Sequence, residues 1–192
     1  MRTRLALLCA LALCGCAAAP TAPSLYERVA ARLATRSDLR TLGRPPPQLA
    51  QLDWLRGDWT VEVTVFATAT SAARSERGTS TVTPLLGGTW LQIADAYPHG
   101  TQELSVVTYN QVDRQWISTG IDGAGNAVTS TGTLQGNKLV FEAANVRIMG
   151  ETLNLRQTLT KLGDDEYTIV NEELQGGAWR ALDEYHYRRA QR

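Results

Sequence analysis

From residue 52 onward, hydrophobic and polar positions alternate along short segments, which is the pattern of half-buried β-strands. The first segment, residues 59–65, places a tryptophan and three valines on one side and threonine and glutamate on the other. Turn signals rich in glycine, asparagine and aspartate separate the segments. The pattern predicts strands at residues 59–65, 78–86, 89–97, 103–109, 115–121, 127–134, 138–143, 152–162, 166–174 and 178–188.

About ten short strands without an intervening helical pattern predict an all-β fold. The connections between the segments are short, and this favours pairing between strands that are neighbours in the sequence. We therefore predict an antiparallel up-and-down β-barrel over residues 48–192. A sandwich of two sheets is the alternative that the same pattern permits.

A helix is predicted ahead of the barrel, over residues 24–42. Ser24 and Glu27 have the spacing of a capping box. Leucines and Val29 recur near one face, and arginines occupy the opposite face. The helix either packs on the domain or is loosely tethered to it, or it lies as a basic amphipathic helix on anionic lipid. Its thin apolar face favours the packed or tethered helix. Three prolines at residues 45–47 follow as a stiff linker.

Residues 1–15 have the features of an export signal. Arg2 and Arg4 precede an apolar run, residues 5–13, that is too short to span a bilayer. Residues 13–16, Leu-Cys-Gly-Cys, resemble the lipobox of bacterial lipoproteins, whose last cysteine is acylated and becomes the new N-terminus. The resemblance implies a signal peptide at 1–15, a lipidated Cys16, and a tether, helix and linker at 16–47. Ordinary cleavage after one of the alanines at 17–19 is the alternative.

The residue after Cys16 is Ala17 and not aspartate, which in Gram-negative lipoproteins implies sorting to the outer membrane. We therefore expect an envelope protein, anchored by lipid and facing the periplasm. The other cysteines, Cys9 and Cys14, precede Cys16, so the mature domain lacks disulfides, thiolate ligands and cysteine nucleophiles. The formal net charge is zero and no basic stripe is present, so nucleic acid is not an expected partner, and we expect a monomer.

Residues 57–59, Gly-Asp-Trp, resemble the Gly-x-Trp signature of the calycins, the superfamily of lipocalins and fatty-acid-binding proteins. In lipocalins this tryptophan closes the barrel floor and an arginine near the last strand stacks over it. The resemblance implies these roles for Trp59 and Arg189. A planar cation over an indole face is also physically favourable. Arg189 is in phase with Trp179, Tyr185 and Tyr187, which the alternation assigns to the barrel interior, and Arg188 is not.

A further resemblance is to a secreted bacterial family known only as a domain of unknown function. Its Leu-x-Gly-x-Trp opening corresponds to residues 55–59. Its Tyr-Asn turn and its aromatic strand ending in Ile-Asp correspond to residues 108–110 and 116–122, and a glycine hairpin corresponds to residues 132–134. The resemblance covers residues 52–189 and supports the barrel fold. It implies no activity, because a fold does not define a function.

The usual catalytic and cofactor signatures are missing from the sequence, so we expect no metal and no cofactor. Haem-binding barrels related to the calycins use an inward histidine. Here alternation places His186 on the outward face, although a bulge near Leu182 would reverse that assignment. His99 lies in a predicted surface turn.

Several polar side chains fall on strand faces that should point inward, where an unpaired polar group costs about 1–3 kcal/mol. These residues satisfy one another, line a solvated mouth, or contact a ligand. If these residues contact a ligand, Trp90, Tyr109 and Trp116 are expected to form the aromatic walls of its cavity. The remaining candidate ligand-binding residues are Gln157, Asn171, Glu173, Asp183 and Tyr185.

Three functions follow from these expectations. The favoured one is a barrel that binds a small, largely apolar ligand. The second is an envelope interaction module without a ligand, which would need an exposed apolar patch. The third is an enzyme that uses Glu173 and Asp183, on adjacent strands, as an acid/base pair.

Overall fold

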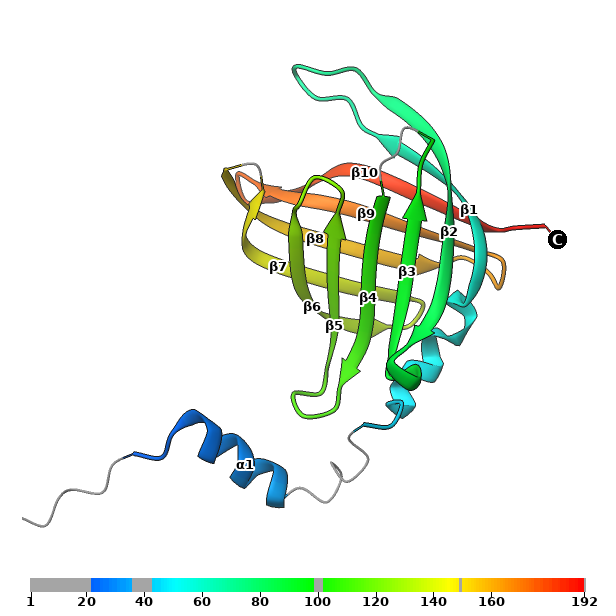
Figure 1. Ribbon diagram of the computed structural model, residues 1–192. Helices are drawn as coiled ribbons and strands as arrows, with labels where there is room; N and C mark the ends of the chain where they lie inside the picture. The colour runs from blue at the N-terminus through cyan, green and yellow to red at the C-terminus, as the bar shows by residue number, and fades with distance from the viewer. Residues whose placement is uncertain (1–21, 36–42, 99–101, 149, 192) are drawn as a thin grey trace, which may run out of the picture. The chain divides into compact units, whose positions relative to one another are not determined.

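The computed structural model describes residues 22–35, 43–98, 102–148 and 150–191 (Figure 1). The helix and the barrel belong to separate compact units of the chain, and each is considered by itself. The helix, α1 (Leu25–Thr35), begins with the predicted capping box. The Ser24 amide donates to Glu27 Oε2 at 2.6 Å, and the Glu27 amide donates to Ser24 Oγ at 3.2 Å. Residues 36–42, also predicted helical, lie outside the described residues.

The second unit contains ten strands, and their number and order agree with the alternation pattern. Two short 3₁₀ helices, η2 (Pro47–Leu55) and η3 (Leu86–Gly88), accompany them. The strands are β1 (Gly57–Val65), β2 (Arg74–Leu85), β3 (Trp90–Ala96), β4 (Gln102–Asn110), β5 (Gln115–Asp122), β6 (Ala127–Gln135), β7 (Lys138–Ile148), β8 (Glu151–Lys161), β9 (Glu166–Gln175) and β10 (Ala178–Arg189).

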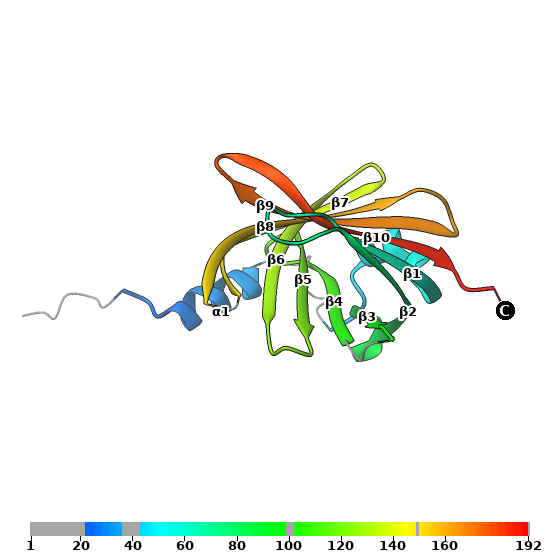
Figure 2. The ribbon, with the colours of Figure 1, turned by 90° about the horizontal axis from the view of Figure 1, so that it is seen from above.

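The ten strands close into one barrel in which each strand pairs antiparallel with its sequence neighbours. Closure is made by β1 and β10, with Trp59 opposite Arg189 and Val65 opposite Asp183. Strands β8–β10 lie along one side of the barrel and β4–β6 along the other (Figure 2). The predicted up-and-down barrel is therefore confirmed, and the alternative of two separate sheets is wrong.

Proline interrupts the alternation of β2 without breaking the strand. Pro84 lies opposite Leu91 of β3, but the pairing of β2 with β1 already ends at Val82. Proline has no N–H to donate, and at this position no strand lies on its β1 side to accept a hydrogen bond. The strand therefore continues to Leu85.

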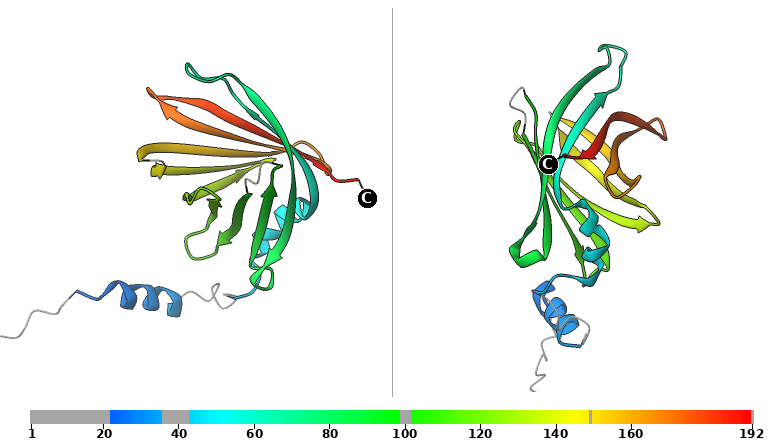
Figure 3. Two further views of the ribbon diagram at one scale, coloured as in Figure 1. Left: turned by 45° about the horizontal axis from the view of Figure 1, so that its top comes forward. Right: turned by 90° about the vertical axis from the view of Figure 1, so that its right-hand side faces the viewer.

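The 3₁₀ helix η2 closes one end of the barrel, which we call the floor (Figure 3). Leu49, Leu52 and Leu55 of this segment are buried in the main hydrophobic core. Trp59 is only 1% exposed, and its indole N–H donates a 2.7 Å hydrogen bond to the Leu55 carbonyl. The leucines cover the ends of the inward strand faces, and the indole hydrogen bond fixes the segment to the first strand.

Bulges change the side-chain direction along two strands. In β10 the register shifts between Ala181 and Asp183, so Trp179 and Ala181 do not share a face with Tyr185. The prediction that Trp179 points inward is wrong, because the extra residue, Leu182, reverses the alternation on that side of the bulge. In β7 a second bulge lets the strand continue to Ile148, beyond its predicted end at residue 143.

Candidate ligand-binding cavity

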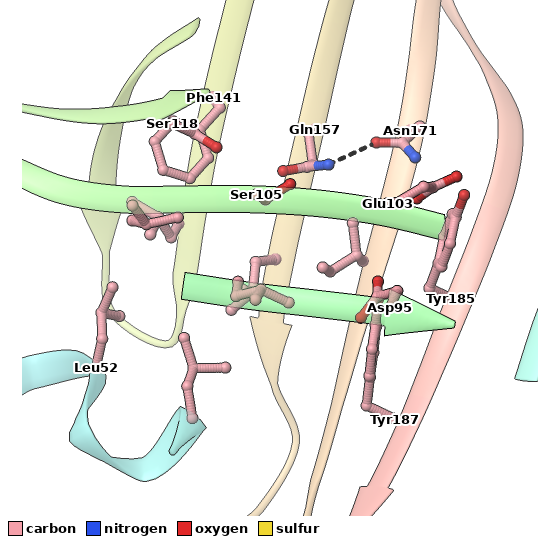
Figure 4. A pocket seen from close by; sticks show the side chains of 16 residues that line it. Leu52, Asp95, Glu103, Ser105, Ser118, Phe141, Gln157, Asn171, Tyr185 and Tyr187 are labelled. Carbon is pink, nitrogen blue, oxygen red and sulfur yellow. Dashed lines mark hydrogen bonds between the residues drawn. The ribbon is translucent and has the colours of Figure 1, made fainter. Parts of the chain in front are cut away.

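The barrel encloses a cavity of about 380 Å³ that opens at the end opposite the floor, which we call the mouth. A smaller space of about 50 Å³ continues toward the floor and reaches Leu52 and Leu55. The two spaces adjoin, because they share part of their lining, including Glu103, Phe141 and Tyr185. Figure 4 shows the side chains that line the smaller space. Strands β3–β10 all contribute side chains to it.

Most of the cavity wall is apolar. Alternation along each strand turns every second residue inward, and these positions are mainly aliphatic or aromatic. Apolar side chains toward the floor are Ile93, Val107, Leu139, Phe141, Leu159 and Ile169. Those toward the mouth are Ile121, Val128, Ala143, Ile148, Leu153, Leu155 and Leu182.

A row of polar side chains crosses three adjacent strands at mid-height. Gln157 Nε2 donates to Asn171 Oδ1 at 3.0 Å, and Asn171 Nδ2 donates to Asp183 Oδ1 at 2.7 Å. Burial raises the pKa of Asp183, and the hydrogen bond from Asn171 opposes the increase. Three of the predicted ligand-binding residues thus contact one another and also line the cavity.

A second polar group lies on β3 and β4, facing β10. Asp95 is 8% exposed, and its Oδ2 accepts a 2.9 Å hydrogen bond from the Tyr187 hydroxyl. Its other oxygen, Oδ1, is buried without a hydrogen-bond partner among the described residues. Burial raises the pKa of Asp95, and the hydroxyls of Ser80 and Tyr187 act in the opposite direction.

Glu103 lies directly opposite Asp95 across the β3–β4 pair, and both carboxyl groups line the interior (Figure 4). Burial, followed by the negative charges of Asp95, Asp183, Asp122 and Glu76, raises the pKa of Glu103 to about 7. Like charges directly opposite on neighbouring strands repel each other, so the folded barrel favours a proton on this pair.

The floor side of the polar group is an aromatic cluster. Tyr167 and Tyr187 stack with ring centres 4.3 Å apart, and Trp59 meets Tyr167 edge to face at 4.7 Å. Tyr185 lies toward the mouth and lines the cavity, and its ring centre is 6.3 Å from that of Tyr187. The tyrosines of β9 and β10 therefore connect the floor to the polar part of the cavity.

The remaining predicted wall residues do not line the cavity. Trp90 is out of phase with the inward residues of β3, Leu91 and Ile93. Tyr109 and Trp116 pack edge to face at 5.5 Å, with Trp116 in the hydrophobic core, and neither contributes to the cavity wall.

The predicted carboxylate pair is not assembled. Glu173 lies opposite Arg180 of β10, whereas Asp183 lies opposite Asn171. Gln175 donates a 2.8 Å hydrogen bond to Glu173, which lines neither part of the cavity. Glu173 therefore does not share the cavity with Asp183.

His186 points away from the cavity, in agreement with the alternation of β10. Its Nε2 lies 2.7 Å from Glu166 Oε1, and the neighbouring Arg188 also contacts Glu166. The bulge at Leu182 reverses the side-chain directions of the residues before it, and His186, which follows it, stays on the outer face. His99 lies outside the described residues.

Among the described residues, no group of three histidine, cysteine, aspartate or glutamate side chains has an arrangement that could hold a metal ion. The described helices are also too short, or too polar, to cross a bilayer. The arrangement of the interior is instead that of a binding cavity, with an apolar wall and a few convergent polar groups.

The fold and the interior define a closed ten-stranded antiparallel barrel with a cavity that opens at one end. A family model described as "Protein of unknown function (DUF1579)" matches residues 44–189, and the chain belongs to this family. The predicted resemblance to a family of unknown function is thereby confirmed. No curated protein sequence matches the chain.

A crystal structure of Rv2717c from M. tuberculosis is similar, with a TM-score of 0.57 and 13% sequence identity. The similarity covers 77% of this chain and 99% of that chain, and it supports the fold alone. A protein of unknown function from the DUF3598 family of Nostoc punctiforme has a TM-score of 0.21 and 8% identity over 71% of this chain and 97% of that chain. Such a low TM-score supports no structural argument.

Proposed function

We propose that this protein binds a small, largely apolar ligand inside the barrel. The observation that carries the proposal is the cavity of about 380 Å³, which lies within the range of small-molecule sites. A barrel of this kind can instead be filled by its own side chains. Here the inward positions include small residues such as Ser105, Ser118 and Gly120, which leave space between the larger apolar side chains.

The other two functions have less support. The acid/base pair of Glu173 and Asp183 is not assembled, as described above. Large hydrophobic side chains exposed on the described part of the barrel are dispersed over three elements and the loop after β8, and they do not make one apolar patch. They are Leu86, Ile121, Leu162 and Leu174.

Binding can be tested with N-phenyl-1-naphthylamine, a neutral probe that fluoresces in apolar surroundings. We expect purified protein to give a saturable fluorescence increase with one probe per chain. The variants Ala143→Trp and Leu155→Trp place an indole in the cavity and should weaken probe binding at least tenfold. Ala127→Trp, on an exposed position of β6, is the matched control.

Each variant is first tested for cooperative urea unfolding, so that loss of binding is not confused with loss of the fold. Absence of a saturable signal from the wild-type protein would contradict the proposal. An equal effect of the cavity variants and the control would contradict it as well. Native mass spectrometry of protein isolated from its own envelope would then identify a retained molecule.

We propose in addition that a lipid on Cys16 anchors the chain in the cell envelope, with the barrel in the periplasm. The support is the Leu-Cys-Gly-Cys sequence at residues 13–16, which lies outside the described residues. Cys16→Ser should abolish incorporation of labelled palmitate and release the protein from sedimented membranes. Cys14→Ser is the matched control, because the cysteine at that position is not the acylated residue, and it should leave both properties unchanged.

A further inference from the structure

The interior of the barrel carries buried acidic groups with no basic partner inside it. None of the described residues that line the part nearest the floor is lysine, arginine or histidine, although Asp95 and Glu103 both line it. An ionised carboxylate in such surroundings is costly unless a positive charge or several donors compensate it. The Tyr187 hydroxyl supplies one donor to Asp95, and a proton or a cation outside the chain can supply the remaining compensation.

The basic residue that lines the mouth is engaged elsewhere. Arg156 donates from Nε and Nη2 to Glu172 at 2.7 and 2.8 Å. Its guanidinium carbon also lies 4.5 Å from the ring centre of Trp179. This bidentate pair and the stacking contact hold the guanidinium with the outward residues of β9 and β10, away from Asp95 and Glu103.

The unused hydrogen-bonding capacity is concentrated around Asp95. Asp95 Oδ1 has no partner among the described residues, although the side chain is more than nine-tenths buried. Ser80 lies directly opposite Asp95 on β2, and its hydroxyl opposes the rise in the pKa of Asp95, although neither the hydroxyl nor Asp95 Oδ1 completes a hydrogen bond with a described residue. The hydroxyl of Tyr97, two residues after Asp95, is a third such group. Buried polar atoms of this kind usually have partners. The two hydroxyls can donate or accept, whereas an ionised Asp95 Oδ1 can only accept, so a donor from a ligand would complete its hydrogen bonding.

We propose that the cavity selects ligands that combine an apolar body with a positively charged amino group, and that Asp95 and Glu103 receive the ammonium group. An ammonium group presents three donors, which match Asp95 Oδ1 and the Glu103 carboxylate on neighbouring strands. The apolar body would then lie against Phe141 and the aliphatic residues of the wall. This inference rests on the proposed ligand-binding function.

An organic cation fits the site better than a metal ion. The described residues contain no cluster of three acidic or histidine side chains with the arrangement of a metal site. Tyr185 borders the same space, and aromatic rings attract organic cations. The surrounding wall is apolar, which suits an alkyl or aryl substituent and not a hydrated ion.

The test compares three ligands that share a six-carbon chain: hexylammonium, 1-hexanol and hexanoate. Binding is measured directly by calorimetry at pH 8, above the pKa of about 7 for Glu103. We expect hexylammonium to bind the wild-type protein at least tenfold more tightly than 1-hexanol, and hexanoate more weakly than either. Glu103→Gln and Asp95→Asn should each reduce the preference for hexylammonium over 1-hexanol to less than threefold.

Glu184→Gln is the matched control, because position 184 alternates with the inward Asp183 and Tyr185 on β10. It should retain the full preference. Equal binding of hexylammonium and 1-hexanol, or a preference that survives both cavity variants, would overturn the inference and leave the proposed function standing. If neither the neutral probe nor any of the three ligands binds, the proposed function and the inference both fail.

Discussion

The guanidinium carbon of Arg189 lies 3.8 Å from the ring centre of Trp59, so the last strand of the barrel covers the first buried residue of β1. The same guanidinium donates hydrogen bonds to the carbonyls of Arg56 and Trp54, at 2.6 and 2.8 Å. These carbonyls lie at the end of η2, where a helix leaves acceptors unpaired. One side chain thus connects the strand closure to the segment that forms the floor.

Replacing Arg189, whose side chain is half-buried, should therefore destabilise the barrel. We expect Arg189→Ala to lower the free energy of unfolding by about 2–3 kcal/mol, and Arg189→Lys by about 1–2 kcal/mol, because lysine cannot stack and donate to two carbonyls at once. Urea unfolding followed by tryptophan fluorescence measures the change. Arg188→Ala, one residue earlier on the outer face, is the control, and equal effects at both positions would contradict this role.

The barrel could be predicted from the sequence because its signal is local. Each strand turns one face inward, so apolar side chains recur at every second position, and short turns force neighbours to pair. The bulge at Leu182 could not be predicted, because one extra residue changes the direction of Trp179 without changing the composition of the strand. The end of β7 was missed for the same reason, since Asn145 adopts a φ of 56° inside the strand.

Gly132 should tolerate no side chain. A Cβ atom at this position would lie 2.5 Å from the Phe141 ring and 2.6 Å from the Val140 carbonyl oxygen. Gly132→Ala should therefore lower the free energy of unfolding by about 2–3 kcal/mol, measured by urea unfolding. Gly163→Ala, where a Cβ atom would have no neighbour within 4 Å, should change it by less than about 0.5 kcal/mol. A tolerated Gly132→Ala would show that Phe141 is not held against β6.

The stability of the protein should fall as the pH rises from 5 to 8. The pKa of Glu103 is about 7 in the folded barrel and near its ordinary value of 4.5 in the unfolded chain, so folding favours the protonated form. Its contribution is fully present below pH 4.5 and is lost as the pH rises through 7. Asp95 and Asp183, whose pKa values burial also raises, act in the same direction.

The comparison of wild type with Glu103→Gln isolates this effect. Between pH 5 and 8, the free energy of unfolding should decrease by about 1–3 kcal/mol more in the wild type than in the variant. The measurement is the urea midpoint and slope at each pH. Parallel curves for the two proteins would mean that Glu103 is not held in a proton-favouring environment.

The hydrogen bond from Tyr187 to Asp95 should also contribute measurably. Tyr187→Phe removes the 2.9 Å donor and leaves both carboxyl oxygens of a buried aspartate unpaired. We expect a loss of about 1–3 kcal/mol in the free energy of unfolding, and a smaller loss when Asp95 is already asparagine. Tyr109→Phe is the control, since no side-chain hydrogen bond of Tyr109 is present among those described. Strictly additive effects of the Tyr187 and Asp95 changes would contradict the contact.

The candidate site was only partly accessible from the sequence. Gln157, Asn171 and Asp183 were found because each interrupts an apolar row, and all three line the cavity. The same signal was present on β3, where Asp95 follows Leu91 and Ile93 at alternate positions.

Glu103 could be placed inward by counting back in twos from Tyr109, but nothing local reveals its proximity to Asp95. That depends on the register between β3 and β4, which places the two residues opposite each other. Alternation also does not show how far along the barrel axis a residue lies. The alternation placed Tyr109 and Trp116 on the inward face, but it did not show that they pack against each other and do not line the cavity.

The barrel has an even number of strands, and this parity determines where the chain enters and leaves it. The segment before Gly57 and the segment after Arg189 both emerge at the floor, because β1 and β10 run in opposite directions side by side. A force applied to the chain at Gly57 or Arg189 therefore acts first on the floor and on the Arg189 contacts, and not on the mouth. Under the proposed function, a fusion partner placed after Arg189 should therefore leave ligand entry at the mouth unobstructed.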